Sequence, residues 1–373
     1  MAKLVPKGLR VTFERRGRIQ LPVELVRTRP LRELARNVIV RAGKKHLIAS
    51  SGSALSIDGV YRDLDKYVAR SLRAYPDVRA VYAYEDGALH QFRRSHELGI
   101  HCIYDLPIGY WRANRKISTE EAELQPAWKG TLNALSDRDA KCTLKDHELE
   151  LADTVVVPST FVKKTLEMYP GSKKIVVNPF GVPANISAPR TLTVPAQPLR
   201  VLYVGSLTQR KGISYLFEAI EKAGKAVTLT VIGRKVGQSD VLDRQCEKHR
   251  WIASLPHAEI LAEMRQHDVF VFPSLFEGLA LVIGEAISQG LPVITTPNSG
   301  GTDILRDGVD GFIVPIRDAG AITARLLQLY DDRMLLQRMS DAAREGAARL
   351  DWRGSKARTV SLVREVIGAS SQV

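Results

Sequence analysis

The sequence predicts an α/β protein with two parallel, doubly wound sheets whose strands are connected by helices. Two observations lead to this fold class. Short runs rich in Val, Ile and Tyr alternate with helical segments over residues 79–178 and again over 200–314, which is typical of parallel sheets with crossover helices. Residues 183–198, between the two series, hold four prolines and no periodic pattern, so we expect a linker there.

The first series belongs to an N-terminal domain that we expect over residues 1–182. Its strands are predicted at 79–84, 101–105, 154–157 and 174–178, and its helical segments at 88–98, 119–151 and 160–168. Before residue 79 the pattern is weaker, with possible strands at 10–13 and 46–49 and a helix at 64–75. The strand and glycine-rich turn that usually open a doubly wound domain are not found there.

The second series predicts a C-terminal domain over residues 199–350, with ligands expected beyond the carboxyl ends of its strands. Helices at 319–330 and 333–350 close it, and a last helix at 354–367, within the segment 351–373, could pack back onto the N-terminal domain. The strands are predicted at 200–204, 227–232, 251–253, 268–272, 292–296 and 311–314, and the helices between them at 211–223, 241–248, 257–266, 279–288 and 302–305.

Positive charge is concentrated at the start of the chain. Residues 1–50 hold 13 Lys or Arg against three acidic residues, a net +10 out of +13 for all 373 residues. Because aromatic residues that could stack on bases are not interleaved with this charge, we expect no nucleic-acid partner. An anionic membrane surface or a phosphate-bearing substrate fits the charge. The membrane surface is supported by apolar residues that run among the arginines. The alternative is that the segment simply begins the first domain and its arginines are solvated.

Composition excludes several other classes. No run approaches the 18 apolar residues of a membrane-spanning helix, and the N-terminus lacks the apolar run of a signal peptide, so we expect a cytoplasmic protein. Three widely spaced cysteines argue against a disulfide framework and a zinc cluster. Asp63-Leu-Asp65 and Asp137-Arg-Asp139 lie in charged helical stretches and are interpreted as solvated faces. We therefore expect no metal and no cofactor.

Two segments at strand ends carry the chemistry. Gly205-Ser-Leu-Thr-Gln-Arg-Lys-Gly212 runs from a strand into a helix, where glycines allow a phosphate close to the backbone and Arg210 and Lys211 add cationic donors. A plain turn with solvated basic residues is the alternative. Weaker glycine turns of the same kind follow at Gly233 and at residues 298–303.

The second segment, residues 272–285, holds two carboxylates in an apolar stretch. Glu277 lies in the loop after a buried strand, and Glu285 lies about two turns into the predicted helix, ~12 Å further along. Carboxylates in apolar surroundings generally have a partner or a ligand.

Together these features resemble the retaining glycosyltransferases of family 4, which have the GT-B fold of two Rossmann-like domains facing a cleft. The Glu-x7-Glu pattern at Glu277 and Glu285 is the family's most specific signature. Further segments follow in the family's order, strongly over residues 150–353 and less well before: Asp153-Thr-Val-Val-Val-Pro-Ser159, Pro179-Phe-Gly-Val182, Ser299-Gly-Gly and Asp307-Gly-Val-Asp-Gly311.

The resemblance implies a role for each matching residue. Lys211 and Arg210 would hold the donor's diphosphate, and Glu277 would touch the transferred sugar. Glu285 would bind the ribose hydroxyls. The remaining donor-binding residues would be Gly205, Ser206, Gly233, Ile252, His257, Gly278, Leu279, Ala280 and Leu281.

Two positions depart from the family's pattern. Asp105 ends a strand of the first domain where many members have a histidine, and it is our candidate for contacting the donor sugar or the acceptor. Ser206 stands where the family often has an arginine paired with the lysine, a loss that Arg210 would compensate.

The function implied is a metal-independent, retaining transfer of a hexose from a nucleotide-diphosphate donor to a glycan or lipid-linked acceptor, as in polysaccharide biosynthesis. Lys211 and Arg210 would replace the metal of the other glycosyltransferase architecture. The enzyme would be cytoplasmic or peripheral on the inner face of the membrane. A nucleotide-sugar epimerase or hydrolase of the same fold, or a nucleotide-sugar-binding protein without catalysis, are the alternatives.

Overall fold

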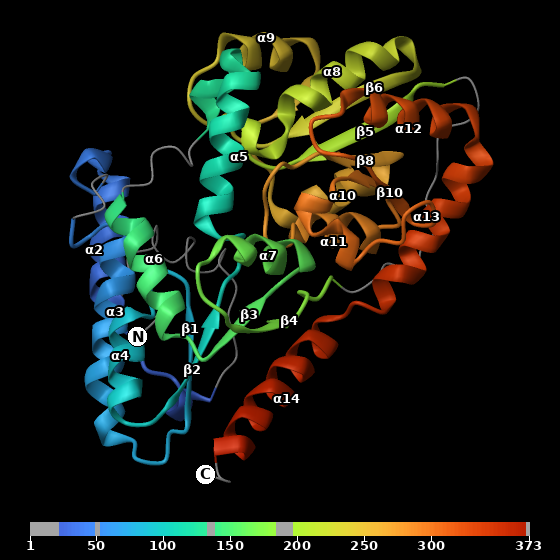
Figure 1. The fold of residues 1–373 in the computed structure, drawn as a ribbon. Helices are drawn as coiled ribbons and strands as arrows, with labels where there is room; N and C mark the ends of the chain where they lie inside the picture. The colour runs from blue at the N-terminus through green and yellow to red at the C-terminus, as the bar shows by residue number, and fades with distance from the viewer. Residues whose placement is uncertain (1–21, 49–52, 133–138, 184–196, 371–373) are drawn as a thin grey trace. The chain divides into compact units, whose positions relative to one another are not determined.

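The computed structural model describes residues 22–48, 53–132, 139–183 and 197–370 (Figure 1). These residues fall into two compact units, Met1–Leu64 and Asp65–Val373, which are considered one at a time. The predicted strand at 10–13 and most of the predicted linker lie outside the described residues.

Among its described residues, the first unit contains the helix α2 (Pro30–Arg41). Proline at its first position fits, because the amide hydrogen that proline lacks has no partner in a helix at that point. The short 3-10 helices η2 (Val23–Leu25) and η3 (Lys45–Ile48) flank it, so the strand predicted at 46–49 is wrong for its described part. Leu31 is 80% exposed and Val38 54% exposed on α2.

The second unit begins within α3 (Ile57–Ser71) and contains two sheets. The N-terminal sheet has four parallel strands in the order β1-β2-β3-β4, and helices α4, α6 and α7 connect them. The strands thus follow one another across the sheet in chain order, as in one half of a doubly wound sheet. None of the described residues supplies a strand before β1. The bounds are β1 (Ala80–Tyr84), α4 (Leu89–Glu97), β2 (His101–Asp105), α6 (Asp139–Leu151), β3 (Thr154–Val157), α7 (Thr160–Thr165) and β4 (Lys174–Val177).

The last helix, α14 (Trp352–Ser370), returns to this N-terminal sheet. Its Leu362 and Val366 pack against Ile103 of β2 and Val156 of β3 in a small apolar cluster. A helix from the end of the chain therefore covers one face of a sheet built near its beginning.

The C-terminal sheet has the order β7-β6-β5-β8-β9-β10, all strands parallel. Numbered from its first strand, this is the doubly wound order 3-2-1-4-5-6, whose direction reverses between β5 and β8. The strands are β5 (Leu199–Val204), β6 (Val227–Ile232), β7 (Arg250–Ile252), β8 (Val269–Phe272), β9 (Val293–Thr295) and β10 (Gly311–Ile313); the helices are α8 (Ile213–Ala223), α9 (Asp240–Lys248), α10 (His257–Gln266), α11 (Leu281–Ser288), α12 (Ala319–Asp331) and α13 (Arg333–Ala348).

The helical material predicted at 119–151 is divided, and its first part packs on the C-terminal sheet's core. Helix α5 (Trp111–Leu124) leads into the 3-10 helix η5 (Pro126–Thr131), which lies against α9 (Figure 1). The Trp128 ring, 6% exposed, stacks on Phe217 of α8 with centroids 6.0 Å apart. The sequence pattern did not predict this packing across the two halves.

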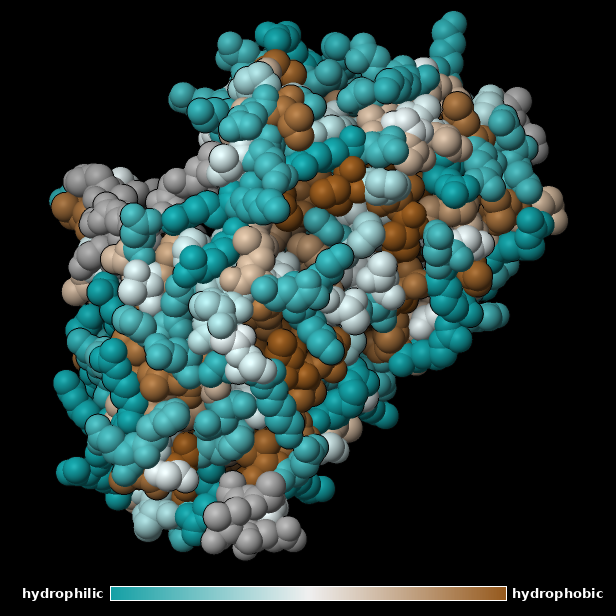
Figure 2. Space-filling view, in the orientation of Figure 1, coloured by the Kyte–Doolittle hydropathy of each residue, from teal (hydrophilic) through white to brown (hydrophobic). Residues whose placement is uncertain are grey.

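None of the described helices combines the length and hydrophobicity that crossing a bilayer requires. The face drawn in Figure 2 is largely hydrophilic, with apolar residues gathered in patches near its middle.

Candidate functional site

The two chemically interesting segments leave neighbouring strands at the reversal point of the C-terminal sheet. The first follows β5 and the second follows β8, and the two strands pair in parallel through Val201 opposite Val269. Side-chain and backbone groups just after these two strands therefore meet at one edge, where doubly wound sheets bind ligands.

Glycines make the close approach of these loops feasible. A Cβ on Gly233 would lie 1.8 Å from the carbonyl oxygen of Gly205, and a Cβ on Gly212 would lie 2.0 Å from that of Pro273. Gly212 also has a φ of +69°, which only glycine adopts without strain. Its left-handed conformation ends the 3-10 helix η8 (Gln209–Lys211). Lys211 is therefore the last residue of η8 and not the first residue of the following α-helix, as predicted.

Glu277 is the centre of a charged cluster beneath these loops. Its Oε1 lies 2.5 Å from Lys211 Nζ and 3.0 Å from Arg210 Nη1, and it accepts a hydrogen bond of 3.0 Å from the Ser274 hydroxyl. The Glu277 side chain is 11% exposed and that of Lys211 14%. One carboxylate thus neutralises two cations in a place with little access to water.

Burial changes the acid–base equilibrium of Lys211. Desolvation lowers the pKa of its ammonium, although the negative charge of Glu277 opposes that shift. The ammonium also lies 5.0 Å from the ring centre of Phe272, within the range of a cation–π contact. Lys211 is therefore a partly desolvated cation that an added negative charge would stabilise.

Glu285 is closer to the loop than predicted. Helix α11 begins at Leu281 and not at residue 279, so Glu285 is one turn into the helix instead of two. Its Oε1 lies 3.0 Å from Nε2 of His257, at the start of α10. The structure thus brings together two residues that are 28 positions apart in the sequence. They meet beyond the end of β7, whose last residue, Ile252, is half-buried.

The backbone amides of the predicted donor-binding residues Gly278, Leu279, Ala280 and Leu281 are not equivalent. That of Ala280 donates to the carbonyl of Ser299 at 3.0 Å, so it is already occupied. Gly278, Leu279 and Leu281 have amides with no acceptor among the described residues.

Contacts from the first half of the chain reach this loop. The Ser159 hydroxyl donates to the Gly278 carbonyl at 2.6 Å, and a Cβ on Gly278 would lie 1.7 Å from the carbonyl oxygen of Pro107. Asp303 accepts hydrogen bonds from the amide and hydroxyl of Thr160. Both sheets therefore contribute to the surroundings of Glu277.

Asp105 and Ser206 take other partners. The Tyr82 hydroxyl donates to Asp105 at 3.1 Å, and burial raises the pKa of Asp105. Asp105 lines a pocket of about 190 Å³ together with residues of α14 such as Trp352 and Lys356; its lining contains none of the charged residues around Glu277. The Ser206 carbonyl accepts a hydrogen bond from Tyr203.

Sequence reasoning missed two supporting residues. Ser274 lies within the segment 272–285 and donates a hydrogen bond directly to Glu277. Glu121 of α5, fully buried, accepts from Gln209 Nε2 at 2.7 Å and from Arg317 Nε at 2.8 Å. Gln209 precedes Arg210 in the loop, so Glu121 fixes the loop from far away in sequence, and no local pattern signals that.

The described aspartates of the two Asp-x-Asp sequences have partners within the protein. Asp65, interpreted as solvated, is 2% exposed and accepts hydrogen bonds from the amides of His90 and Gln91. Asp63 pairs with Arg29 and Arg32, Asp139 pairs with Arg115, and Asp137 lies outside the described residues.

One group of potential metal ligands is present in the described part of the chain, at His96, Cys102 and Asp153. Burial raises the pKa of the Cys102 thiol to about 12, so the thiolate that a metal requires is disfavoured at neutral pH. The buried Cys102, Cys142 and Cys246 form no disulfide among the residues described.

Comparison with known proteins agrees with this architecture. Residues 187–346 match the family described as "Glycosyl transferases group 1". Glycogen synthase of Mycobacterium tuberculosis (strain ATCC 25618 / H37Rv) is 31% identical over 196 residues, which are 49% of this chain and 46% of the relative. The putative colanic acid biosynthesis glycosyltransferase WcaL of Salmonella typhimurium is 28% identical over 198 residues, covering 47% of each chain. The matches thus span about half the length of these relatives.

Solved structures extend the similarity over most of the chain. Sucrose-phosphate synthase from Thermosynechococcus elongatus superposes with a TM-score of 0.66 at 19% identity, covering 87% of this chain and 83% of the other. Anabaena HepE in complex with UDP superposes with a TM-score of 0.61 at 16% identity, covering 80% and 82%. The chain therefore has the GT-B fold, and its residues 187–346 are similar to the glycosyl transferases group 1 family.

Proposed function

We propose that the protein is a retaining glycosyltransferase that moves a hexose from a nucleoside-diphosphate donor to a glycan or lipid-linked acceptor without a metal ion. The observation that carries this proposal is the buried Glu277 between Arg210 and Lys211 at the reversal point of the sheet. The group 1 domain and the UDP complex of the similar HepE support it.

The two cations would act on the leaving group. When the bond between the sugar's anomeric carbon and the diphosphate breaks, negative charge grows on the diphosphate oxygen. Lys211 and Arg210, fixed and partly dehydrated, would stabilise that charge without rearrangement. Gly205 and Gly233 would leave room for the phosphates beside the backbone.

The carboxylates would act on the sugar and the ribose. Glu277 would face the positive charge that develops at the anomeric carbon, and the amides of Gly278, Leu279 and Leu281 would hold the sugar's oxygens. Glu285 would accept hydrogen bonds from the ribose hydroxyls. His257 and Ile252 would lie near the base, and Asp105 would contact the donor sugar or the acceptor.

The first experiment identifies the donor. Unfolding is followed with UDP-, GDP- and ADP-sugars, and a true donor at 100 times its Kd is expected to stabilise the fold by about 2.7 kcal/mol. With the donor known, NMR of the product should show the donor's anomeric configuration retained. An inverted product would overturn the retaining mechanism and leave the donor site standing.

Glu277→Gln tests the central residue. We expect turnover to fall roughly 100-fold or more while the nucleoside diphosphate still binds. Glu218→Gln, which removes an exposed carboxylate of α8, is the matched control and should keep full activity. A fully active Glu277→Gln enzyme would remove Glu277 from this role, and mass spectrometry of quenched reactions would reveal any glycosyl–enzyme adduct on it.

The absence of a metal requirement is tested separately. Activity should survive EDTA, whereas Lys211→Ala should weaken binding of donor and nucleoside diphosphate alike. Loss of activity in EDTA that manganese restores would contradict this part of the proposal.

Two other functions predict different results. An epimerase or hydrolase of the same fold would consume the donor with no acceptor present. A nucleotide-sugar-binding protein would be stabilised by the donor but would release no nucleoside diphosphate with any acceptor.

Association with the cytoplasmic face of a membrane is part of the proposal. The exposed Leu31 and Val38 lie seven residues apart, hence on one side of α2, among basic residues. The protein should float with anionic liposomes at low salt and dissociate at high salt. Binding that survives deletion of residues 1–45 would contradict a role for this segment.

A further inference from the structure

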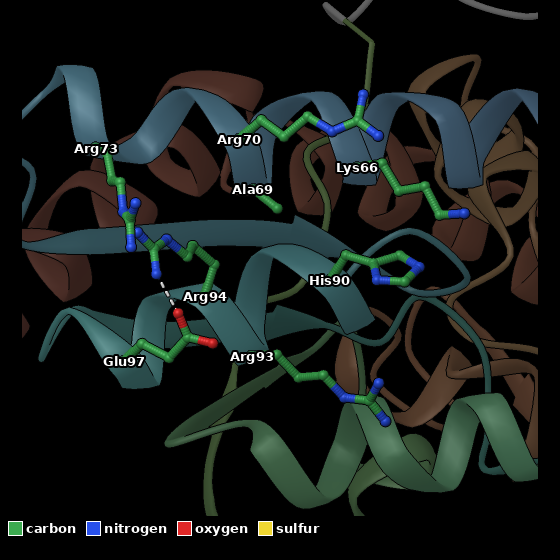
Figure 3. A pocket seen from close by; sticks show the side chains of 8 residues that line it. All are labelled: Lys66, Ala69, Arg70, Arg73, His90, Arg93, Arg94 and Glu97. Atoms are coloured by element: carbon green, nitrogen blue, oxygen red, sulfur yellow. Dashed lines mark hydrogen bonds and ion pairs between the residues drawn. The ribbon is translucent and has the colours of Figure 1, made fainter.

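A second basic site lies between α3 and α4, on elements that the proposed transfer reaction does not use. A groove of about 640 Å³ is lined by residues 66–97 of the second unit only. Figure 3 shows two facing rows of side chains, one from α3 and the turn after it and one from α4: Lys66, Ala69, Arg70, Arg73, His90, Arg93, Arg94 and Glu97.

The cations of this groove are not neutralised by the protein around them. Lys66, Arg70, Arg73 and Arg93 have no ion-pair partner in the described part of the chain. Glu97 is the only acid of the lining, and it pairs with Arg94. Five permanent cations against one carboxylate leave the groove with a net charge of +4.

The carboxylate of Asp65, which acts on His90, does not compensate. It is buried and accepts hydrogen bonds of 2.8 Å from the amides of both His90 and Gln91 in the first turn of α4. Its charge therefore serves the start of that helix. The groove's cations, whose mutual repulsion disfavours the empty state, remain available to an anion.

The pKa of the His90 imidazole responds to the positive charge of the groove. Its pKa is lowered chiefly by burial, and Lys66, Arg93 and Arg70 lower it further, while Asp65 opposes the shift. A bound anion would reverse the contribution of the three cations and raise the pKa of His90.

We propose that this groove binds a phosphate-bearing ligand at a site distinct from that of the donor. A phosphate group carries about twice the charge of a carboxylate, which suits a net charge of +4. Guanidinium groups bind its oxygens in pairs. The rows run about 10 Å along each helix, from residue 66 to 73 and from 90 to 97, enough for two linked phosphates.

The shape of the groove supports a ligand held between the helices. Arg73 and Arg94 extend toward one another from opposite walls in Figure 3, so a phosphate between them would contact both rows at once. The phosphate could belong to a soluble diphosphate or to a lipid headgroup; the chemistry of the site is the same, and the test separates the sources.

The test measures binding of inorganic pyrophosphate by calorimetry, with Lys211→Ala as the background so that the proposed donor site does not contribute. In that background, Arg70→Glu with Arg93→Glu should weaken binding by about tenfold or more, because two charge-assisted contacts to the phosphate oxygens are lost. Arg353→Glu with Arg364→Glu, both exposed on α14, changes the net charge equally and should leave binding unchanged.

A spectroscopic measurement places the ligand. Pyrophosphate should raise the pKa of His90, followed by NMR of its ring protons, and Arg70→Gln with Arg93→Gln should reduce that shift. The glutamine pair also serves if the charge-reversed protein fails to fold. Because both measurements record binding, they are independent of whether the protein transfers a sugar.

Vesicles identify the source. Binding to phosphatidylcholine vesicles that contain phosphatidic acid, but not to phosphatidylcholine alone, and its loss in the Arg70 and Arg93 variant, would assign the groove to a lipid headgroup. Pyrophosphate binding, together with vesicle binding that the Arg70 and Arg93 variant fully retains, would assign the groove to a soluble phosphate, because the N-terminal segment alone would then account for the vesicle binding. The proposal is overturned if the groove variant and the α14 control bind both pyrophosphate and vesicles equally.

Discussion

Glu277→Gln should lower the stability of the protein even without substrate, because Glu277 neutralises two cations. The substitution leaves Arg210 and Lys211 side by side with no negative charge between them. Removing one partner of a buried ion pair costs about 3–5 kcal/mol. Since glutamine keeps an acceptor for the Ser274 hydroxyl and the pair is slightly exposed, we expect a loss of about 2–3 kcal/mol in the free energy of unfolding.

The loss should depend on pH with a definite sign. Without Glu277, the pKa of Lys211 falls further below its ordinary value of 10.5. The folded variant then binds fewer protons than the unfolded chain, so its stability rises with pH up to about 10.5. The difference from the original protein should therefore shrink as the pH increases from neutrality.

Urea unfolding of four proteins measures the effect: the original, Glu277→Gln, Lys211→Met and the double variant. We expect the double variant to lose less stability than the sum of the single losses, because it leaves one cation and not two. UDP should also recover more stability in Glu277→Gln than in the original, since its diphosphate replaces the missing charge. A Glu277→Gln protein as stable as the original, or strictly additive losses, would refute this reasoning.

Three further predictions follow from packing and burial. Gly212→Ala should lower stability by about 2 kcal/mol or more and weaken nucleotide binding, because residue 212 is left-handed and its Cβ would clash with the Pro273 carbonyl. Thermal unfolding and a UDP titration check this prediction, and unchanged values would contradict it. Trp128→Ala should cost about 3–5 kcal/mol in urea unfolding by removing its stack on Phe217, and a loss below 1 kcal/mol, the scale of a surface substitution, would contradict its buried position. Burial raises the pKa of Glu148 from 4.5 to about 7, so its stabilising contribution is complete below pH 4.5 and is lost as the pH rises through 7. Glu148→Gln should therefore flatten the dependence of stability on pH in this range, and an unchanged slope would contradict the prediction.

The central strands of the sheets, such as β3, β8 and β9, could be predicted because each is a short apolar run buried on both faces. Val155 and Val157 point into the core on one side of β3, and Val156 packs under α14 on the other. Such a strand is hydrophobic whatever covers it, so its pattern is local. The Glu-x7-Glu spacing is also local, and it located Glu277 and Glu285 before any contact was known.

What could not be predicted depends on contacts between distant segments. The first turn of α8 starts after Lys211 because Gly212 must fit against Pro273. The sequence predicts a solvated Asp65 because the amides that donate hydrogen bonds to it belong to α4. No residue close to Asp65 in the sequence indicates that α4 packs beside it. Likewise, charge alone could not distinguish Arg70, in a groove, from the other arginines around it.

The packing of α5 and η5 on the C-terminal sheet bears on how this chain could be recombined with others. Residues 111–131 precede the predicted linker, yet Trp128 lies in the C-terminal core and Glu121 holds Gln209. A chimera joined within residues 183–198 would take residues 111–131 from one parent and the C-terminal core on which they pack from the other. Exchange of donor specificity between relatives should therefore succeed only when residues 111–131 are transferred together with the C-terminal half.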